Sequence, residues 1–266
     1  MNRIEALFRR LKTENRRGLV GYLTAGDPNV EQSERDVRTA LDNGVDLLEL
    51  GLPFSDPTAD GPTIQAAAGR ALAAGMTLPR ALDMVRRLRA DYDQPLVLFG
   101  YANPLFRYGY ERFCADAAEA GADGLLIVDL PFEVSEEIRP CAERHGLDPI
   151  ALIAPTTSPE RAGRILAKAR GFVYYIMVKG VTGARAALVE DLAARVDALR
   201  GVTNLPIAAG FGVSDGGQAA DVARAADAVV VGSALVRAAR QGTLAEKVRE
   251  LKDAIAQSEA TAKGTA

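Results

Sequence analysis

Short apolar runs alternate with longer segments of helical periodicity along most of the chain. Eight runs, rich in leucine or β-branched residues, have the length of buried strands: residues 19–24, 47–51, 96–101, 125–129, 150–154, 172–178, 206–210 and 228–232. Continuous apolar runs separated by helices are typical of parallel strands that are buried on both faces. Eight such units in 266 residues favour an α/β fold with a single (β/α)8 TIM barrel over a doubly wound sheet.

The two ends of the chain lie outside these units. Residues 1–17 carry apolar side chains at positions 4, 7, 8 and 11, which form one stripe on a helix. We expect this helix to cap the bottom of the barrel; the alternative, a transit peptide, fits less well because the segment lacks serine richness. Residues 258–266 are small and polar, and are expected to be frayed. No linker divides the remainder, so we expect one domain over residues 1–266.

Two strand-to-strand intervals are longer than the others. The interval after residues 47–51 has room for an extra helix at residues 62–74, and the interval after residues 172–178 begins with a glycine-rich segment at 179–185. Loops that follow the strands form the face of a barrel that carries the active site. The added length therefore predicts functional loops at both places.

The amino-acid composition of the chain argues against several classes of protein and several kinds of catalytic site. The 32 basic and 35 acidic side chains nearly balance, which argues against a nucleic-acid binder. One histidine and two cysteines are too few for most zinc sites. The single histidine, His145 before Gly146, is typical of a helix end, which argues against a Ser-His or Cys-His triad. We interpret Cys114 and Cys141 as reduced core residues, as in a cytoplasmic protein. No apolar run approaches the roughly 20 residues that span a membrane. An acid or base should therefore be a carboxylate, a tyrosine or a lysine.

Glu49 is the first candidate for that role. Period-two alternation along residues 47–51 places it on the face opposite Leu48 and Leu50, so it points into the barrel if the leucines face the helices. Apolar surroundings disfavour the charged carboxylate and raise its pKa toward the range useful for acid and base catalysis. The alternative is a glutamate paired with a buried cation, but the inner strand positions offer few cations.

Asp60 is the second candidate. It lies in a loop with three prolines, at positions 53, 57 and 62. The loop could hold Asp60 over the site opposite Glu49, or Asp60 could simply cap the helix that begins near Pro62. Considered alone, the loop favours neither interpretation.

Glycine-rich turns indicate phosphate binding. Gly210-Phe211-Gly212 and Gly232-Ser233 end the seventh and eighth predicted strands, where many barrels bind phosphate through backbone N–H groups at a helix start. The alternative is two tight turns without a ligand. Thr182 and Gly183 in the sixth loop are typical of a lid, and the neighbouring Lys179 could instead form a Schiff base.

Residues 48–62, LELGLPFSDPTADGP, closely resemble the signature of the tryptophan synthase alpha subunit family. Tyr101-Ala102-Asn103-Pro104 and the glycine motifs at 180–183, 210–212 and 232–234 follow in the order of that family, so the resemblance covers nearly the whole chain. Departures at Tyr22, Thr58 and residues 177–179 concern the indole pocket and the lid, and remove no proton-transfer group.

The resemblance implies retro-aldol cleavage of indole-3-glycerol phosphate to indole and glyceraldehyde 3-phosphate. It implies that Glu49 is the acid and base, and that Asp60 accepts a hydrogen bond from the indole N–H. The resemblance implies that Tyr22, Tyr175 and Phe211 line the indole pocket and that Tyr101 is a further substrate-binding residue. It implies that Gly183, Gly212, Gly232 and Ser233 bind the phosphate and that Thr182 helps to set Asp60.

The resemblance also implies a partner, the tryptophan synthase beta subunit, in an α2β2 heterotetramer. Pyridoxal phosphate would belong to that subunit, with no cofactor or metal in this chain. Prolines and aromatic residues at 53–57, 103–106 and 131–132 suit a docking surface on the active-site face; local packing of loop on barrel is the alternative. Two other hypotheses are a Schiff-base aldolase that uses Lys179 and a phosphate-binding barrel that acts only as a regulatory partner.

Overall fold

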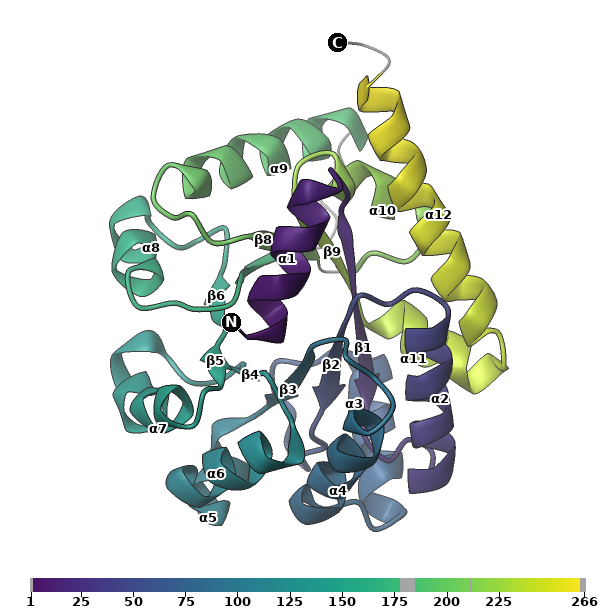
Figure 1. Ribbon diagram of the computed structural model, residues 1–266, viewed down its shortest axis with the longest axis vertical. Helices are drawn as coiled ribbons and strands as arrows, with labels where there is room; N and C mark the ends of the chain where they lie inside the picture. Colours follow the sequence, from purple (N-terminus) through teal and green to yellow (C-terminus); the bar gives the residue numbers. More distant parts are fainter. Residues whose placement is uncertain (1, 178–184, 211, 264–266) are drawn as a thin grey trace.

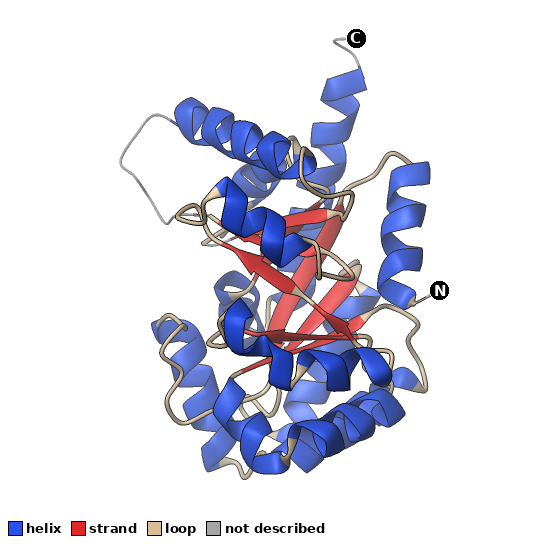
Figure 2. Cartoon of the chain, turned by 90° about the vertical axis from the view of Figure 1, so that its left-hand side faces the viewer, coloured by secondary structure: helices blue, strands red, loops and turns tan. Residues whose placement is uncertain are grey.

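The computed structural model describes residues 2–177, 185–210 and 212–263. In this part of the chain one parallel sheet curls into a barrel, and helices surround it (Figures 1 and 2). The strands are β1 (Gly18–Thr24), β2 (Leu47–Gly51), β3 (Leu96–Gly100), β4 (Gly124–Ile127), β5 (Asp148–Pro149), β6 (Ala151–Ile153), β7 (Val173–Ile176), β8 (Ile207–Gly210) and β9 (Ala228–Val231). The predicted barrel is confirmed.

Helices follow the strands along the chain. They are α1 (Arg3–Thr13), α2 (Val30–Asp42), α3 (Pro62–Ala73), α4 (Leu78–Arg89), α5 (Ala102–Tyr108), α6 (Tyr110–Ala120), the 3-10 helix η1 (Phe132–Glu137), α7 (Arg139–Arg144), α8 (Pro159–Leu166), α9 (Arg185–Arg200), α10 (Gly216–Ala223), α11 (Ser233–Gln241) and α12 (Leu244–Lys263). The extra helix expected after the second strand is α3. Of the end expected to be frayed, residues 264–266 lie outside the described residues; α12 extends to Lys263, and Ser258 is buried, with its hydroxyl donating to Ile255 O at 2.7 Å.

The fifth predicted strand is divided into two. β5 pairs with β4, whereas β6 pairs with β7, and the Ile150 N–H between them donates to Leu125 O at 2.8 Å. Closing a barrel requires a stagger between strands. The N–H groups of Asp148 and Ile150 face β4, so the N–H that Pro149 lacks would have faced the opposite side, where pairing with β7 begins only at Ala151. The two short strands therefore occupy one position of the barrel, and β5 and β6 form the two ends of the sheet in the described residues.

The N-terminal helix closes one end of the barrel. Ile4, Leu7, Phe8 and Leu11 of α1 are buried in a cluster with inner-face strand residues such as Leu47. In Figure 1, α1 lies across the barrel opening. The cap predicted from the apolar stripe is confirmed.

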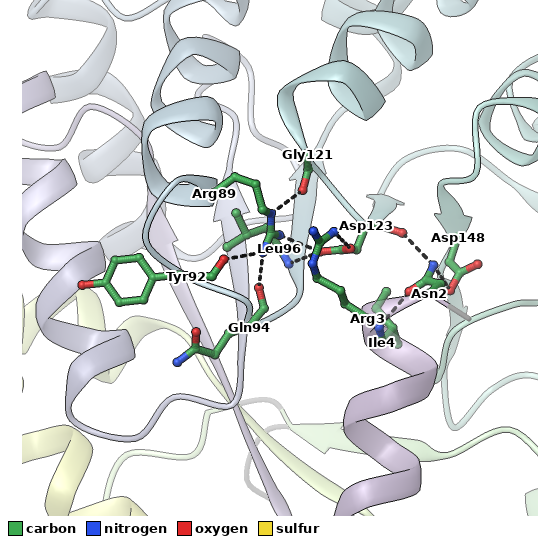
Figure 3. A network of polar contacts seen from close by, with 10 residues as sticks. All are labelled: Asn2, Arg3, Ile4, Arg89, Tyr92, Gln94, Leu96, Gly121, Asp123 and Asp148. Atoms are coloured by element: carbon green, nitrogen blue, oxygen red, sulfur yellow. Dashed lines mark hydrogen bonds and ion pairs between the residues drawn. The ribbon is translucent and has the colours of Figure 1, made fainter.

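Asp123, which directly precedes β4, anchors this closed end (Figure 3). Its carboxylate accepts hydrogen bonds from Leu96 N at 2.9 Å, Arg89 Nη2 at 2.8 Å and Arg3 Nη1 at 3.1 Å. The side chains of Asp123 and Arg89 are only 4% and 12% exposed. One carboxylate thus connects α1, the end of α4 and the start of β3.

We expect Asp123→Ala to lower the free energy of unfolding by about 3 kcal/mol, because it leaves the Arg89 guanidinium buried without its carboxylate. Urea unfolding measures the loss. Asp197→Ala is the control: Asp197 is 72% exposed in its ion pair with Arg200, so its loss should stay within about 0.5 kcal/mol. Equal losses in the two variants would contradict the anchoring role.

Candidate active site

Glu49 lies on the inner face of β2. Leu48 and Leu50 belong to the outer core beneath the helices, whereas Leu47 belongs to the inner cluster, so the alternation predicted for this strand is confirmed. The Glu49 side chain is buried at 1% exposure, and its Oε1 has no hydrogen-bond partner in the described residues. Burial raises the pKa of Glu49 to about 8. The group therefore carries a proton at neutral pH.

The neighbours of Glu49 in the sheet are uncharged. Tyr22 of β1 and Val97 of β3 are its register partners on either side. Among the described ion pairs none involves Glu49, so the alternative of a glutamate neutralised by a buried cation finds no support there. An isolated buried carboxyl is costly, and such groups cluster at functional sites.

This burial predicts a pH-dependent cost to stability. Between pH 4.5, the ordinary pKa of the group, and about pH 8, folded Glu49 keeps a proton that the unfolded chain has lost. The folded state then binds more protons, so its stability falls as the pH rises through this window. We expect Glu49→Gln to remove that fall and to have the higher Tm above pH 8, measured by thermal unfolding at pH 5, 7 and 9. Parallel Tm profiles for the two proteins would contradict the buried protonated state.

Asp60 is held by a second set of contacts. Its Oδ2 accepts a hydrogen bond from Tyr101 Oη at 2.9 Å, and the same Oη accepts from Ala59 N at 3.1 Å. Gln65 Nε2 of α3 donates to the Asp60 carbonyl at 2.9 Å. The N-cap of α3 is Gly61, which has no side-chain capping bond, so Asp60 does not cap this helix.

The two carboxyl groups therefore differ in environment. Burial raises the pKa of Asp60, but the hydrogen bond from Tyr101 opposes that rise, whereas Glu49 has burial alone. Environments that separate two carboxyl groups in this way allow one to act as an acid and the other to remain ionised.

Tyr22 shapes the interior beside Glu49. Its side chain is 5% exposed, its ring meets Phe99 edge-on at 5.1 Å, and its hydroxyl lies 3.3 Å from Thr24 Oγ1. A Cβ at Gly51 would lie only 2.1 Å from Tyr22 Oη, so the glycine is needed to admit this ring. Phe99 is not predicted from the sequence, although it lies two residues after Val97 and therefore points to the same inner face of the strand.

Tyr175 does not line this interior, which corrects the sequence-based prediction. It packs in the outer core, and Arg195 of α9 lies beside it. Tyr174 packs against the inner cluster instead, and its pKa is raised well above the ordinary value, chiefly by burial and then by the nearby Glu49 and Asp60. Phe172 is also in the inner cluster, so the period of two along β7 could have identified Tyr174.

The glycine turns lie at the ends of the last two strands. A Cβ at Gly210 would lie 2.3 Å from Val230 O, so glycine is required where β8 approaches β9. Gly212 has φ of +76° and is exposed. Gly232 directly precedes α11, and its Cβ position lies 3.6 Å from Tyr22 Cβ. The start of α11 at Ser233 is thus next to the interior that contains Glu49. Thr182, Gly183, Phe211 and the alternative nucleophile Lys179 lie outside the described residues.

Other predicted chemistry is placed elsewhere. His145 ends α7 and contacts Glu111 at 2.8 Å, and Cys114 and Cys141 are free thiols, buried and partly buried respectively. Within residues 2–177, 185–210 and 212–263, no group of three or more His, Cys, Asp or Glu side chains is arranged to hold a metal ion. In the same ranges, no helix combines the length and apolar character needed to cross a membrane.

Comparison with known proteins gives consistent matches. The tryptophan synthase alpha chain family model matches residues 8–265. The tryptophan synthase alpha chain of Geobacter sulfurreducens is 50% identical over 251 residues, which cover 94% of this chain and 95% of that protein. The alpha chain of Citrifermentans bemidjiense is 52% identical over 237 residues, 89% of each chain.

Solved structures agree. Tryptophan synthase subunit alpha from Legionella pneumophila superposes with a TM-score of 0.88 at 37% identity, over 97% of this chain and 99% of that one. A chain of the aminoacrylate-bound tryptophan synthase of M. tuberculosis gives a TM-score of 0.87 at 34% identity, over 96% of this chain and 100% of that one.

Proposed function

This chain belongs to the tryptophan synthase alpha chain family, and we propose that Glu49 and Asp60 perform in it the reaction of that family. The reaction is the cleavage of indole-3-glycerol phosphate to indole and glyceraldehyde 3-phosphate, which makes the chain a lyase of tryptophan biosynthesis. The observation that carries the proposal is the buried Glu49 carboxyl, which has no hydrogen-bond partner in the described residues. It lies on β2, the strand that leads directly into the loop of Asp60.

Glu49 alone can perform both proton transfers of the reaction, because it gives up one proton and takes one back. Protonated Glu49 gives its proton to indole C3, and Asp60 stabilises the positive charge that develops at the indole nitrogen. The Glu49 carboxylate then removes the proton of the C3′ hydroxyl as the C3–C3′ bond breaks. The electron pair of that bond restores the indole ring, glyceraldehyde 3-phosphate leaves as the aldehyde, and Glu49 is again protonated.

We assign the remaining contacts by their position around these two groups. Tyr22, Phe99 and Tyr174 line the indole pocket, and Tyr101 orients Asp60 through its hydrogen bond. The phosphate is held by backbone N–H groups of Gly212, Gly232 and Ser233 at the turns and at the start of α11. Gly183 and Phe211 complete the phosphate and indole subsites in this proposal, and Thr182 sets Asp60.

The partner is the tryptophan synthase beta subunit, which receives the indole. We propose an α2β2 heterotetramer in the cytoplasm, with pyridoxal phosphate bound by the beta subunit and no cofactor required by this chain. The loop at 53–57, residues 103–106 of α5 and residues 131–132 form the docking surface of the proposal, and Phe106 among them is 64% exposed. Exposed large aromatic residues favour burial against a partner.

One assay tests the proposal: release of glyceraldehyde 3-phosphate from indole-3-glycerol phosphate, with and without a beta subunit. We expect release by the chain alone and faster release in the complex. Substrate binding without release in either condition would instead support the regulatory barrel. Borohydride trapping of a covalent adduct, lost in Lys179→Met, would support the Schiff-base aldolase.

A further inference from the structure

A cavity lies in the barrel wall, away from the carboxyl groups of Glu49 and Asp60. It has a volume of about 410 Å³, and its lining includes neither Glu49 nor Asp60. Residues of η1 and α7 form one side and residues of α8 form the other, at the place where the sheet ends in the short strands β5 and β6. We call this feature the wall cavity.

The broken strand explains why the cavity is apolar. All residues of β1, β2, β8 and β9 are buried, whereas Ile127 and Ala151, which pack against the outer core and line the wall cavity, are only half-buried. Apolar strand surface that helices cover elsewhere in the barrel therefore faces an opening here. A volume in this range accepts a small organic ligand.

Arg139 supplies a polar group to the same cavity. Its guanidinium pairs with Glu136 and, at 3.5 Å, with Glu143 through other nitrogens. Its Nε is buried and has no hydrogen-bond partner in the described residues. Leaving a buried donor unpaired is costly, and a charged donor most of all. An acceptor oxygen from a ligand, above all a carboxylate, would satisfy this nitrogen.

Three cations line the rim of the cavity, and each of them is held in an ion pair with a glutamate. Arg161 and Lys168 line the cavity with Arg139, against Asp129 as the acidic member of the lining. Glu133 of η1 pairs with Arg161 at 2.6 and 2.9 Å, and Glu136 pairs with Lys168 at 2.7 Å. Exposed pairs of this kind contribute about 0.2–1 kcal/mol each, so opening the rim costs little.

We propose that the wall cavity binds a small aromatic carboxylate of one or two rings. The ring packs on the half-buried strand residues, and the carboxylate accepts a hydrogen bond from Arg139 Nε. The cavity lies between α7 and α8, and neither Glu49 nor Asp60 lines it, so the proposed ligand is not held at the two carboxyl groups.

Calorimetric titration of the full chain with 2-naphthoate tests the proposal, with 2-naphthamide as the neutral probe of the same shape. We expect the carboxylate to bind at least about tenfold more tightly than the amide, and Arg139→Met to weaken it by about tenfold, the range of a charge-assisted hydrogen bond. Arg112→Met on α6, where the side chain is 74% exposed, is the matched control and should bind unchanged.

Ala169→Leu provides a second variant that retains every charge. Ala169 lines the cavity, and the larger side chain should fill it and abolish binding whether or not Arg139→Met folds. Equal affinity for the two probes, no binding at millimolar concentration, or unchanged binding to Ala169→Leu would each overturn the proposal. The last result would place the probe elsewhere, as in the barrel interior beside Glu49.

Discussion

Glu49→Gln is expected to reduce the turnover of indole-3-glycerol phosphate by about 10,000-fold while the substrate still binds. Acid and base catalysis by one positioned group typically contributes up to about this factor, and here the same group serves two proton transfers. Glutamine keeps the shape of the side chain but neither gives nor removes a proton. Single-turnover measurement of glyceraldehyde 3-phosphate release gives the rate, and calorimetry gives the substrate Kd.

Glu246→Gln is the matched control, because Glu246 is 66% exposed on α12 and far along the chain from the site. Its turnover should equal that of the unmodified chain. A Glu49→Gln variant that keeps more than about a tenth of the turnover would exclude Glu49 as the acid and base, since loss of proton transfer is expected to cost at least about 100-fold.

Most of the fold follows from periodicity in the sequence. Seven of the eight predicted strands and the helix at the start of the chain appear close to their expected bounds, because apolar runs buried on both faces have few other structures open to them. The division of the fifth strand does not follow from its apolar pattern. It depends on which neighbour each residue pairs with, a property of the closed barrel rather than of residues 148–153.

The site was predictable where alternation or a long motif determines it. Glu49 is inside because Leu48 and Leu50 must be outside. The prediction that Tyr175 lines the indole pocket rests on the resemblance and not on the alternation along the strand. The structure places Tyr174 on the inner face instead. The contact between Tyr101 and Asp60 joins residues 41 positions apart, and no local pattern encodes such a pair.

Asp60→Asn is expected to lower kcat by about 1,000-fold with a smaller change in substrate affinity. Asp60 is ionised in the proposed reaction, so its charge acts on the positive indole nitrogen, which exists only as the reaction proceeds. A neutral amide in the same place loses that charge. Steady-state kinetics with indole-3-glycerol phosphate, supported by calorimetry of substrate binding, separates the two effects.

Tyr101→Phe is the companion variant, because it keeps the Asp60 carboxylate and removes the hydrogen bond at 2.9 Å. That bond lowers the pKa of Asp60, so its removal raises this pKa. Activity that requires ionised Asp60 is lost as the pH falls through its pKa, and the acidic limb of the kcat profile should therefore move to higher pH. Asp60→Asn should lack this limb. If Asp60→Asn retained near-normal kcat, or if the Tyr101→Phe limb moved to lower pH, Asp60 would be a structural residue of the loop, and the stabilising charge would have to come from another group.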